Sequence, residues 1–305
     1  MDHKTALKHD RVQPPAQPVL RGILLILCAV ALFSLSDTLA KVLRQSLPAV
    51  EVAWLRYVVF AVFAVVLAVR SRAGLRPRRP GLQALRALTL LGSAVLFITG
   101  LSHLQVAEAT AISFIAPAFI TALSIPLLGE VVGVRRWVAM LAGLLGVLVV
   151  IRPGAGALTA GAVFPLCSAL CWAATVVITR RMGTADRAET TLFWSAVAGL
   201  VVLTAIVPSG FVPLTAGQLG IALVLGACSS VGQYLVILAY RRVSASVLAP
   251  FSYAQILSST GMGLLVFGAV PDRWTFAGAA IVILSGLYTA QRERIRAQER
   301  TAAKA

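Results

Sequence analysis

Three charged residues near the start of the chain could do chemistry, because each lies within a long apolar stretch. Asp37 is the only carboxylate well inside such a stretch, and Lys41 follows it by one helical turn. Arg56 lies in the next stretch at the same depth as Asp37, about 9 Å from the end at 1.5 Å per residue. Two interpretations stay open: a substrate or proton site, or a structural salt bridge from Asp37 to Arg56 or to Lys41. One acid against two bases leaves positive charge, which would suit an acidic group of a substrate.

Polar and aromatic residues of two later stretches form a second group of candidates. Gln233 and Tyr234 lie in one stretch, and Tyr253 and Gln255 lie in the next. Two amides and two tyrosines at neighbouring depths favour the lining of a ligand cavity over hydrogen bonds between helices, which contribute ~0.6 kcal/mol each on average. Trp172 could stack on a planar ligand or pack within the bundle.

Four further residues are candidates for gating or for structure. Pro117 stands in the middle of an apolar stretch, so we expect it to kink a helix and to free a backbone carbonyl. Glu130 follows in a polar turn, where a structural role is favoured over catalysis. Gly143 and Gly146 are expected to permit close helix approach.

The composition indicates a membrane protein. Of the 305 residues, 59% are hydrophobic and 12% are charged, whereas a soluble domain carries about 25% charged residues. The apolar residues occur in long blocks, which predicts an all-α polytopic membrane protein. Net charge is +16, but the basic residues lie between the blocks, as membrane topology requires, so nucleic acid is not an expected partner.

Ten transmembrane helices are predicted between two polar tails, 1–20 and 291–305. Their approximate ranges are 22–43, 50–70, 83–102, 106–128, 134–151, 159–179, 190–208, 216–239, 245–268 and 274–290. With the N-terminus inside, 22 of the 27 Lys and Arg residues fall on the cytoplasmic side. The positive-inside rule therefore predicts that both termini are cytoplasmic, in a bacterial inner membrane.

The chain contains an internal repeat. A first half, 21–152, matches a second half, 158–290, at an offset of 139 or 140 residues, so that Gly146 falls on Gly286. Each half holds five spans, and five is odd, so the halves must enter the membrane in opposite senses. Loop charge agrees, because residues 70–86 carry six arginines and their partner loop, 209–217, carries no charge. The pattern is typical of two inverted five-helix repeats.

These features together resemble the EamA-type drug/metabolite transporters. The resemblance rests on Ala109-Thr110-Ala111, Pro117, Gly129-Glu130 and Gly146, and in the second half on Trp274, Gly278 and Gly286. It implies a secondary, non-ATP transporter of small metabolites such as amino acids or related compounds, with alternating access around a central cavity. Residues 251–288 also look like a subgroup assigned to riboflavin and S-adenosylmethionine transport. The second half departs from the first in having Ala269 in place of Glu130 and no match for Pro117.

Other classes of function fit less well. A membrane-embedded enzyme would need a buried acid/base or metal constellation, and a channel a ring of like groups. One acid in the spans supplies neither, so no catalytic residue, metal or cofactor is expected. Proton coupling through Asp37 is left open. The substrate, the direction of transport and the oligomeric state, a homodimer included, are not readable from the sequence.

Overall fold

The computed structural model describes residues 16–71, 75–129, 134–151, 157–182, 186–242 and 251–302. All regular secondary structure in these ranges is helical. The helices are α1 (Ala16–Leu43), α2 (Ala49–Arg70), α3 (Pro80–Gly100), α4 (Val106–Ser113), α5 (Ala116–Leu128), α6 (Val134–Ile151), α7 (Ala157–Met182), α8 (Ala188–Ile206), the 3-10 helix η1 (Val207–Gly210), α9 (Ala216–Arg242), α11 (Ala254–Phe267) and α12 (Arg273–Ala302).

Apolar helices long enough to cross a membrane account for most of the described chain. Among the described residues, seven helical segments have both the length and the apolar composition of a membrane span: Leu20–Leu43, Ala49–Arg70, Pro80–Gly100, Val106–Leu128, Ala160–Thr179, Glu189–Ile206 and Ala216–Val236. α11 and the apolar part of α12 are shorter. An all-helical chain with several membrane spans is thus confirmed, while the count of ten stays a prediction.

Three predicted segments differ from the structure. The span 106–128 is divided into α4 and α5. The predicted tail 291–305 continues α12 as far as Ala302, because its Arg, Gln, Glu and Ala residues are strong helix formers. At the other end of the chain, α1 begins at Ala16, within the predicted tail 1–20.

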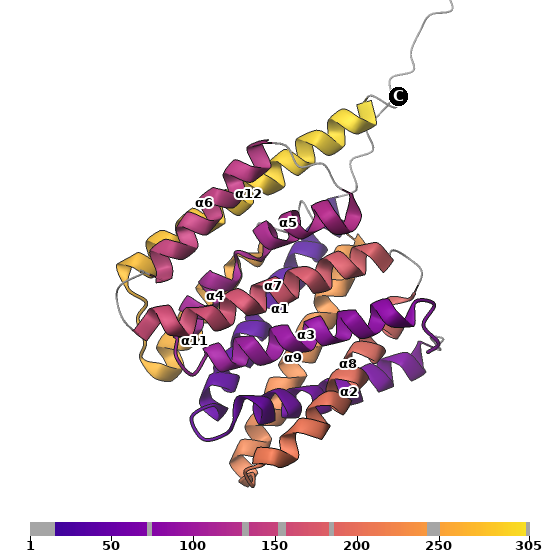
Figure 1. Ribbon diagram of the computed structural model, residues 1–305, viewed down its shortest axis with the longest axis vertical. Coiled ribbons are helices and arrows are strands. Elements are labelled where there is room, and N and C mark those ends of the chain that lie inside the picture. Colours follow the sequence, from indigo (N-terminus) through magenta and orange to yellow (C-terminus); the bar gives the residue numbers. More distant parts are fainter. Residues whose placement is uncertain are drawn as a thin grey trace, which may run out of the picture.

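The helices pack in pairs that recur between the two halves (Figure 1). α1 lies along α9, and α7 lies along α3; α2 packs on α8, and α6 packs on α12. α11 contacts α1 as α5 contacts α7. Exchanging each helix of one half for its counterpart in the other (α1 for α7, α2 for α8, α3 for α9, α5 for α11, α6 for α12) therefore reproduces these pairings.

Hydrogen bonds between the halves close both ends of the bundle. At the end where α3 begins, Asp186 accepts from the backbone N–H of Arg78 at 2.8 Å and from Nε2 of Gln83 at 2.9 Å. At the opposite end, Nε2 of Gln218 donates to Oγ of Ser46 at 2.8 Å. These hydrogen bonds join the two halves at both ends of the bundle.

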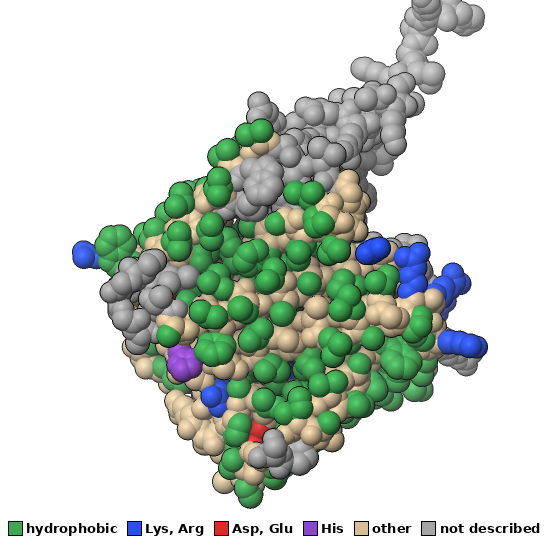
Figure 2. Space-filling model, in the orientation of Figure 1, with side chains coloured by type: hydrophobic (Ala, Val, Ile, Leu, Met, Phe, Trp, Pro, Cys, Tyr) green, Lys and Arg blue, Asp and Glu red, His purple; other side chains and the backbone are tan. Residues whose placement is uncertain are grey.

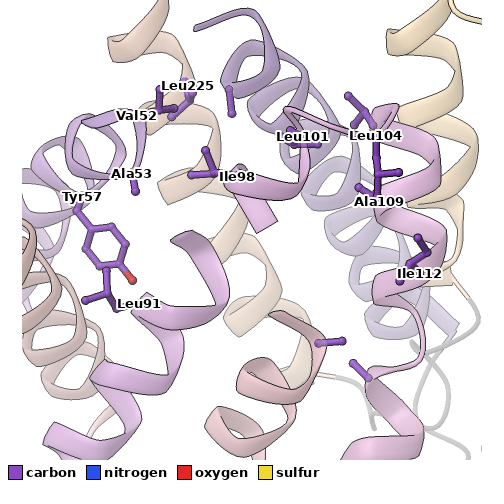
Figure 3. Close-up of a cluster of buried hydrophobic side chains, with 14 of the residues drawn as sticks. Val52, Ala53, Tyr57, Leu91, Ile98, Leu101, Leu104, Ala109, Ile112 and Leu225 are labelled. Carbon is purple, nitrogen blue, oxygen red and sulfur yellow. The ribbon is translucent and has the colours of Figure 1, made fainter. Parts of the chain in front are cut away.

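The interior is packed tightly, and the outer faces are apolar. Tyr57 of α2 lies beside Leu91 of α3 in the main hydrophobic cluster (Figure 3). A Cβ on Gly199 would come within 2.2 Å of the Tyr57 ring, so α8 can approach α2 only with glycine there. Hydrophobic side chains cover most of the visible face, and Lys and Arg gather at one edge (Figure 2). Such a continuous apolar surface suits contact with lipid.

Candidate functional site

An ion pair between Asp37 and Arg56 lies where α1, α2 and α9 meet. Nη1 of Arg56 is 3.7 Å from Oδ1 of Asp37, and its Nε donates to Oγ of Ser229 at 2.7 Å. Asp37 is 5% exposed and the Arg56 side chain 17%. Of the two pairings that the sequence left open for Asp37, the structure has the one with Arg56. Because Ser229 belongs to the second half, the cluster ties both halves together.

The polar face of α1 explains how this cluster is held. Ser34, Ser36 and Thr38 are fully buried around Asp37. Oγ of Ser36 donates to the Leu225 carbonyl of α9 at 3.0 Å, and Oγ of Ser34 lies 3.3 Å from the Gln255 carbonyl of α11. Small hydroxyl side chains can donate hydrogen bonds to backbone carbonyls and still leave room for a second helix to pack closely. The face of α1 that carries Asp37 is therefore the face that contacts the second half.

Lys41 does not pair with Asp37 in the part of the chain that the structure describes, and it lines a small pocket instead. Its Nζ donates to the Leu104 carbonyl at 2.5 Å and lies 5.4 Å from the centre of the Phe267 ring. Glu108 is close enough to interact with it electrostatically. The pocket is lined by residues of α1, α4 and α11 and their loops: Lys41, Gln105, Val106, Ala107, Ser259, Thr260, Gly263, Phe267 and Ala269. Lys41 is the predicted site residue that lines this pocket.

The predicted surplus of positive charge beside Asp37 did not count two acids that the structure buries. Glu51 and Glu108 are buried, with 1% and 8% exposed. An oxygen of Glu51 accepts from the backbone N–H of Val212 at 3.1 Å, and one of Glu108 accepts from the N–H of Gln105 at 2.9 Å. Each acid lies in the first turn of its helix. Their negative charge offsets part of the positive charge that Lys41 and Arg56 were expected to leave.

Two interrupted helices meet near the middle of the bundle. One interruption lies at Phe114 and Ile115, between α4 and α5; the other lies at Tyr253, immediately before α11. Phe114 and Tyr253 are 139 residues apart, the repeat offset, and their ring centres are 5.0 Å apart. Pro117 stands in the first turn of α5 and has no N–H to offer to the carbonyl of Ser113. The break thus provides a backbone acceptor at this depth.

The remaining predicted lining residues are not gathered in one cavity. Tyr234 packs edge-on against Phe63, with 6.0 Å between ring centres, and Tyr253 is 7% exposed. Gln233 and Gln255 are half-buried. Trp172 is 38% exposed on α7, at the outer surface of the bundle.

The glycines named from the sequence lie where α6 meets α12. A Cβ on Gly146 would lie 2.9 Å from the carbonyl oxygen of Gly278, and one on Gly143 would lie 3.2 Å from Oγ of Ser285. Glu130 falls outside the described residues.

Arg86 was not predicted as a site residue, because it had been counted with the basic segment 70–86. It lies in α3 and is 9% exposed. Its Nε donates to Oγ1 of Thr179 at 2.7 Å, and Nη1 donates to Oγ of Ser195. The signal in the sequence was its position six residues after Pro80, which opens the helix.

Comparisons with known proteins agree with this architecture. The model of the EamA-like transporter family matches residues 20–152 and 159–290. A riboflavin transporter of Rhizobium johnstonii is 28% identical over 290 residues, 92% of this chain and 94% of its own. An S-adenosylmethionine uptake transporter of Rickettsia prowazekii is 25% identical over 90% of this chain and 94% of its own.

A further relative and a solved structure also match over most of the chain. A pseudopaline exporter of Pseudomonas aeruginosa is 28% identical over 87% of this chain and 94% of its own. A solved crystal structure matches with a TM-score of 0.63 at 18% identity, over 92% of this chain and 98% of that one.

Proposed function

Because the chain belongs to the EamA-like transporter family, we propose that it carries a small polar metabolite across a bacterial inner membrane by alternating access. The chain is a multi-pass membrane protein, and relatives that match it over most of their length are named as transporters. The finer proposal is that two inverted five-helix repeats rock about a site between them. It is supported by the recurrence of helix contacts between the halves and by two family matches of similar length.

The observation that carries this proposal is the meeting of the two interrupted helices at Phe114 and Tyr253. Transporters built from inverted repeats bind substrate near the midplane, where discontinuous helices expose backbone groups. Here the breaks bring two aromatic rings within 5.0 Å. The hydroxyl of Thr110, one turn earlier in α4, is buried with no hydrogen-bond partner among the described residues. Aromatic faces, a freed carbonyl and an unpaired hydroxyl suit a ring-bearing polar ligand.

The substrate class follows from that lining and from the relatives. Phe114 and Tyr253 would stack on the faces of a planar ring system. Two of the relatives are named for riboflavin and S-adenosylmethionine, which both carry such a ring. We therefore favour a vitamin-like or cofactor-like substrate over a simple amino acid.

Counterflow in proteoliposomes tests this function. Vesicles loaded with unlabelled riboflavin or S-adenosylmethionine should accumulate the same labelled compound, whereas empty vesicles should not. Tyr253→Phe keeps the ring and should retain transport; Tyr253→Ala removes it and should reduce accumulation about tenfold or more, since stacking on one ring contributes ~1–3 kcal/mol. Absence of counterflow for both compounds would refute the substrate class, and equal transport by the two variants would refute the site.

Proton coupling through Asp37 is part of the same proposal. Asp37 is the carboxylate at the junction of α1, α2 and α9, and a change in its charge would alter the contact with Arg56. Asp37→Asn keeps the shape but removes the charge, so pH-driven accumulation should fail while counterflow survives. Full pH-driven accumulation by Asp37→Asn would remove Asp37 from coupling.

A further inference from the structure

We propose that Arg86 binds the anionic group of the transported molecule at the end of the bundle where α3 begins. The inference rests on the proposed transport function and narrows its substrate to molecules that carry a carboxylate or a phosphate. The site lies at the opposite end from the Asp37–Arg56 pair, about 9 Å inside α3 from its first residue, Pro80.

Arg86 is a buried cation that no described carboxylate neutralises. Its hydrogen-bond partners are the hydroxyls of Thr179 on α7 and Ser195 on α8, and the Tyr57 phenol is its electrostatic neighbour. Asp186, an acid at this end, is engaged by Arg78 and Gln83 instead. A guanidinium stays charged and has five N–H donors. Charge and donors thus remain for a further partner.

The Asp37–Arg56 cluster lies at the position that the repeat makes equivalent to the Arg86 cluster, and it contains an acid that the Arg86 cluster lacks. Arg56 of α2 contacts α1 and α9, while Arg86 of α3 contacts α7 and α8, which are the counterparts of α1 and α2. Arg56 has an acid, Asp37, beside it. The residue 139 positions after Asp37 is Val176, so the second site has the cation and the hydroxyls without the acid. A buried charge without a partner in a membrane protein is a functional-site candidate.

Opening this end of the bundle would expose the guanidinium to ligand. Both hydrogen bonds of Arg86 cross from the first half to the second, so the halves cannot separate here without releasing Thr179 and Ser195. An oxyanion can then take the place of those hydroxyls, because a guanidinium binds a carboxylate or phosphate through two parallel N–H bonds. The anion would in turn neutralise the cation in the open state. Arg86 therefore serves as a latch when the end is closed and as an anion site when it opens.

Matched pairs of ligands that differ in one anionic group test the proposal. Dissociation constants are measured on purified full-length protein for riboflavin against riboflavin 5′-phosphate, and for S-adenosylmethionine against its decarboxylated form. In at least one pair, the wild type should bind the anionic member about tenfold more tightly. Arg86→Gln should abolish that preference and leave the affinity for the other member unchanged, whereas Arg86→Lys should retain part of it. Arg76→Gln, an exposed arginine near the same end, is the matched control and should retain it in full.

The outcomes separate this inference from the transport function. No preference for the anionic member in either pair, or a preference that Arg86→Gln leaves intact, overturns the inference. A role in folding alone would lower the melting temperature of Arg86→Gln without changing the ratio of the two dissociation constants. Counterflow of S-adenosylmethionine, which carries a carboxylate, by the wild type tests transport, whereas the ratio of the two dissociation constants in Arg86→Gln tests this inference.

Discussion

Neutralising Asp37 is expected to destabilise the protein, because it leaves the Arg56 cation within the bundle without its acid. Removal of one partner of a buried ion pair costs ~3–5 kcal/mol. Here the cost should be lower, at about 2 kcal/mol. The 3.7 Å separation is an ion pair without a good hydrogen bond, and Arg56 keeps Ser229 and is 17% exposed. For a chain of this size, each kcal/mol lowers the melting temperature by roughly 2 °C, so Asp37→Asn should melt about 4 °C lower.

A double-mutant cycle separates the pair from other effects of the substitutions. Scanning fluorimetry in detergent would compare Asp37→Asn, Arg56→Gln and the double variant. Arg70→Gln, an exposed position on the same helix as Arg56, serves as the control. The double variant should melt higher than the sum of the two single effects predicts, because neither charge is then unpaired. Exchange of the two residues, Asp37→Arg with Arg56→Asp, should also restore stability. Single variants that melt with the wild type, or strictly additive effects in the double variant, would refute the ion pair as a source of stability.

Three further predictions concern packing and topology. Gly146→Leu should separate α6 from α12 and lower the melting temperature by several degrees, since its Cβ alone would lie 2.9 Å from the Gly278 carbonyl; an unchanged melting temperature would contradict that contact. Gly199→Ala places a methyl within 2.2 Å of the Tyr57 ring, and an overpacked core costs ~1–3 kcal/mol, so yield and melting temperature should both fall; combining it with a smaller residue at position 57 should relieve the defect. A cysteine in the 209–215 loop should react with a membrane-impermeant thiol reagent added to intact cells; protection until the cells are lysed would exclude the inverted topology.

The depth of the charged residues along their helices could be predicted from the sequence, but the partner that each one contacts could not. Asp37 and Arg56 were expected at equal depth, and they pair. Depth alone allowed Lys41 equally, because a residue one turn away is also within reach. The choice depends on which face of α1 meets α2, and that is fixed by contacts with α9 and α11.

The interruptions of the two helices were predictable to different degrees. Pro117 marked the first, because proline removes a helical hydrogen bond, and the structure places the break two residues before it. The second break, at Tyr253, has no proline in the position that matches Pro117, and the proline nearby, Pro250, lies three residues before the break. The burial of Glu51 and Glu108 was missed for a related reason: each lies near a helix end, and only packing between the halves covers that end.

Distances across the two ends of the bundle test the central claim, alternating access, most directly. In a cysteine-free background, spin labels at Ser46 and Gln218 report one end, and labels at Arg79 and Arg181 report the other; each pair is joined by a hydrogen bond in the structure. Double electron–electron resonance should give a short and a long distance for each pair. Addition of riboflavin or S-adenosylmethionine should move the two populations in opposite senses, so that one end closes as the other opens. A single short distance at both ends under every condition, or lengthening of both pairs together, would contradict alternating access.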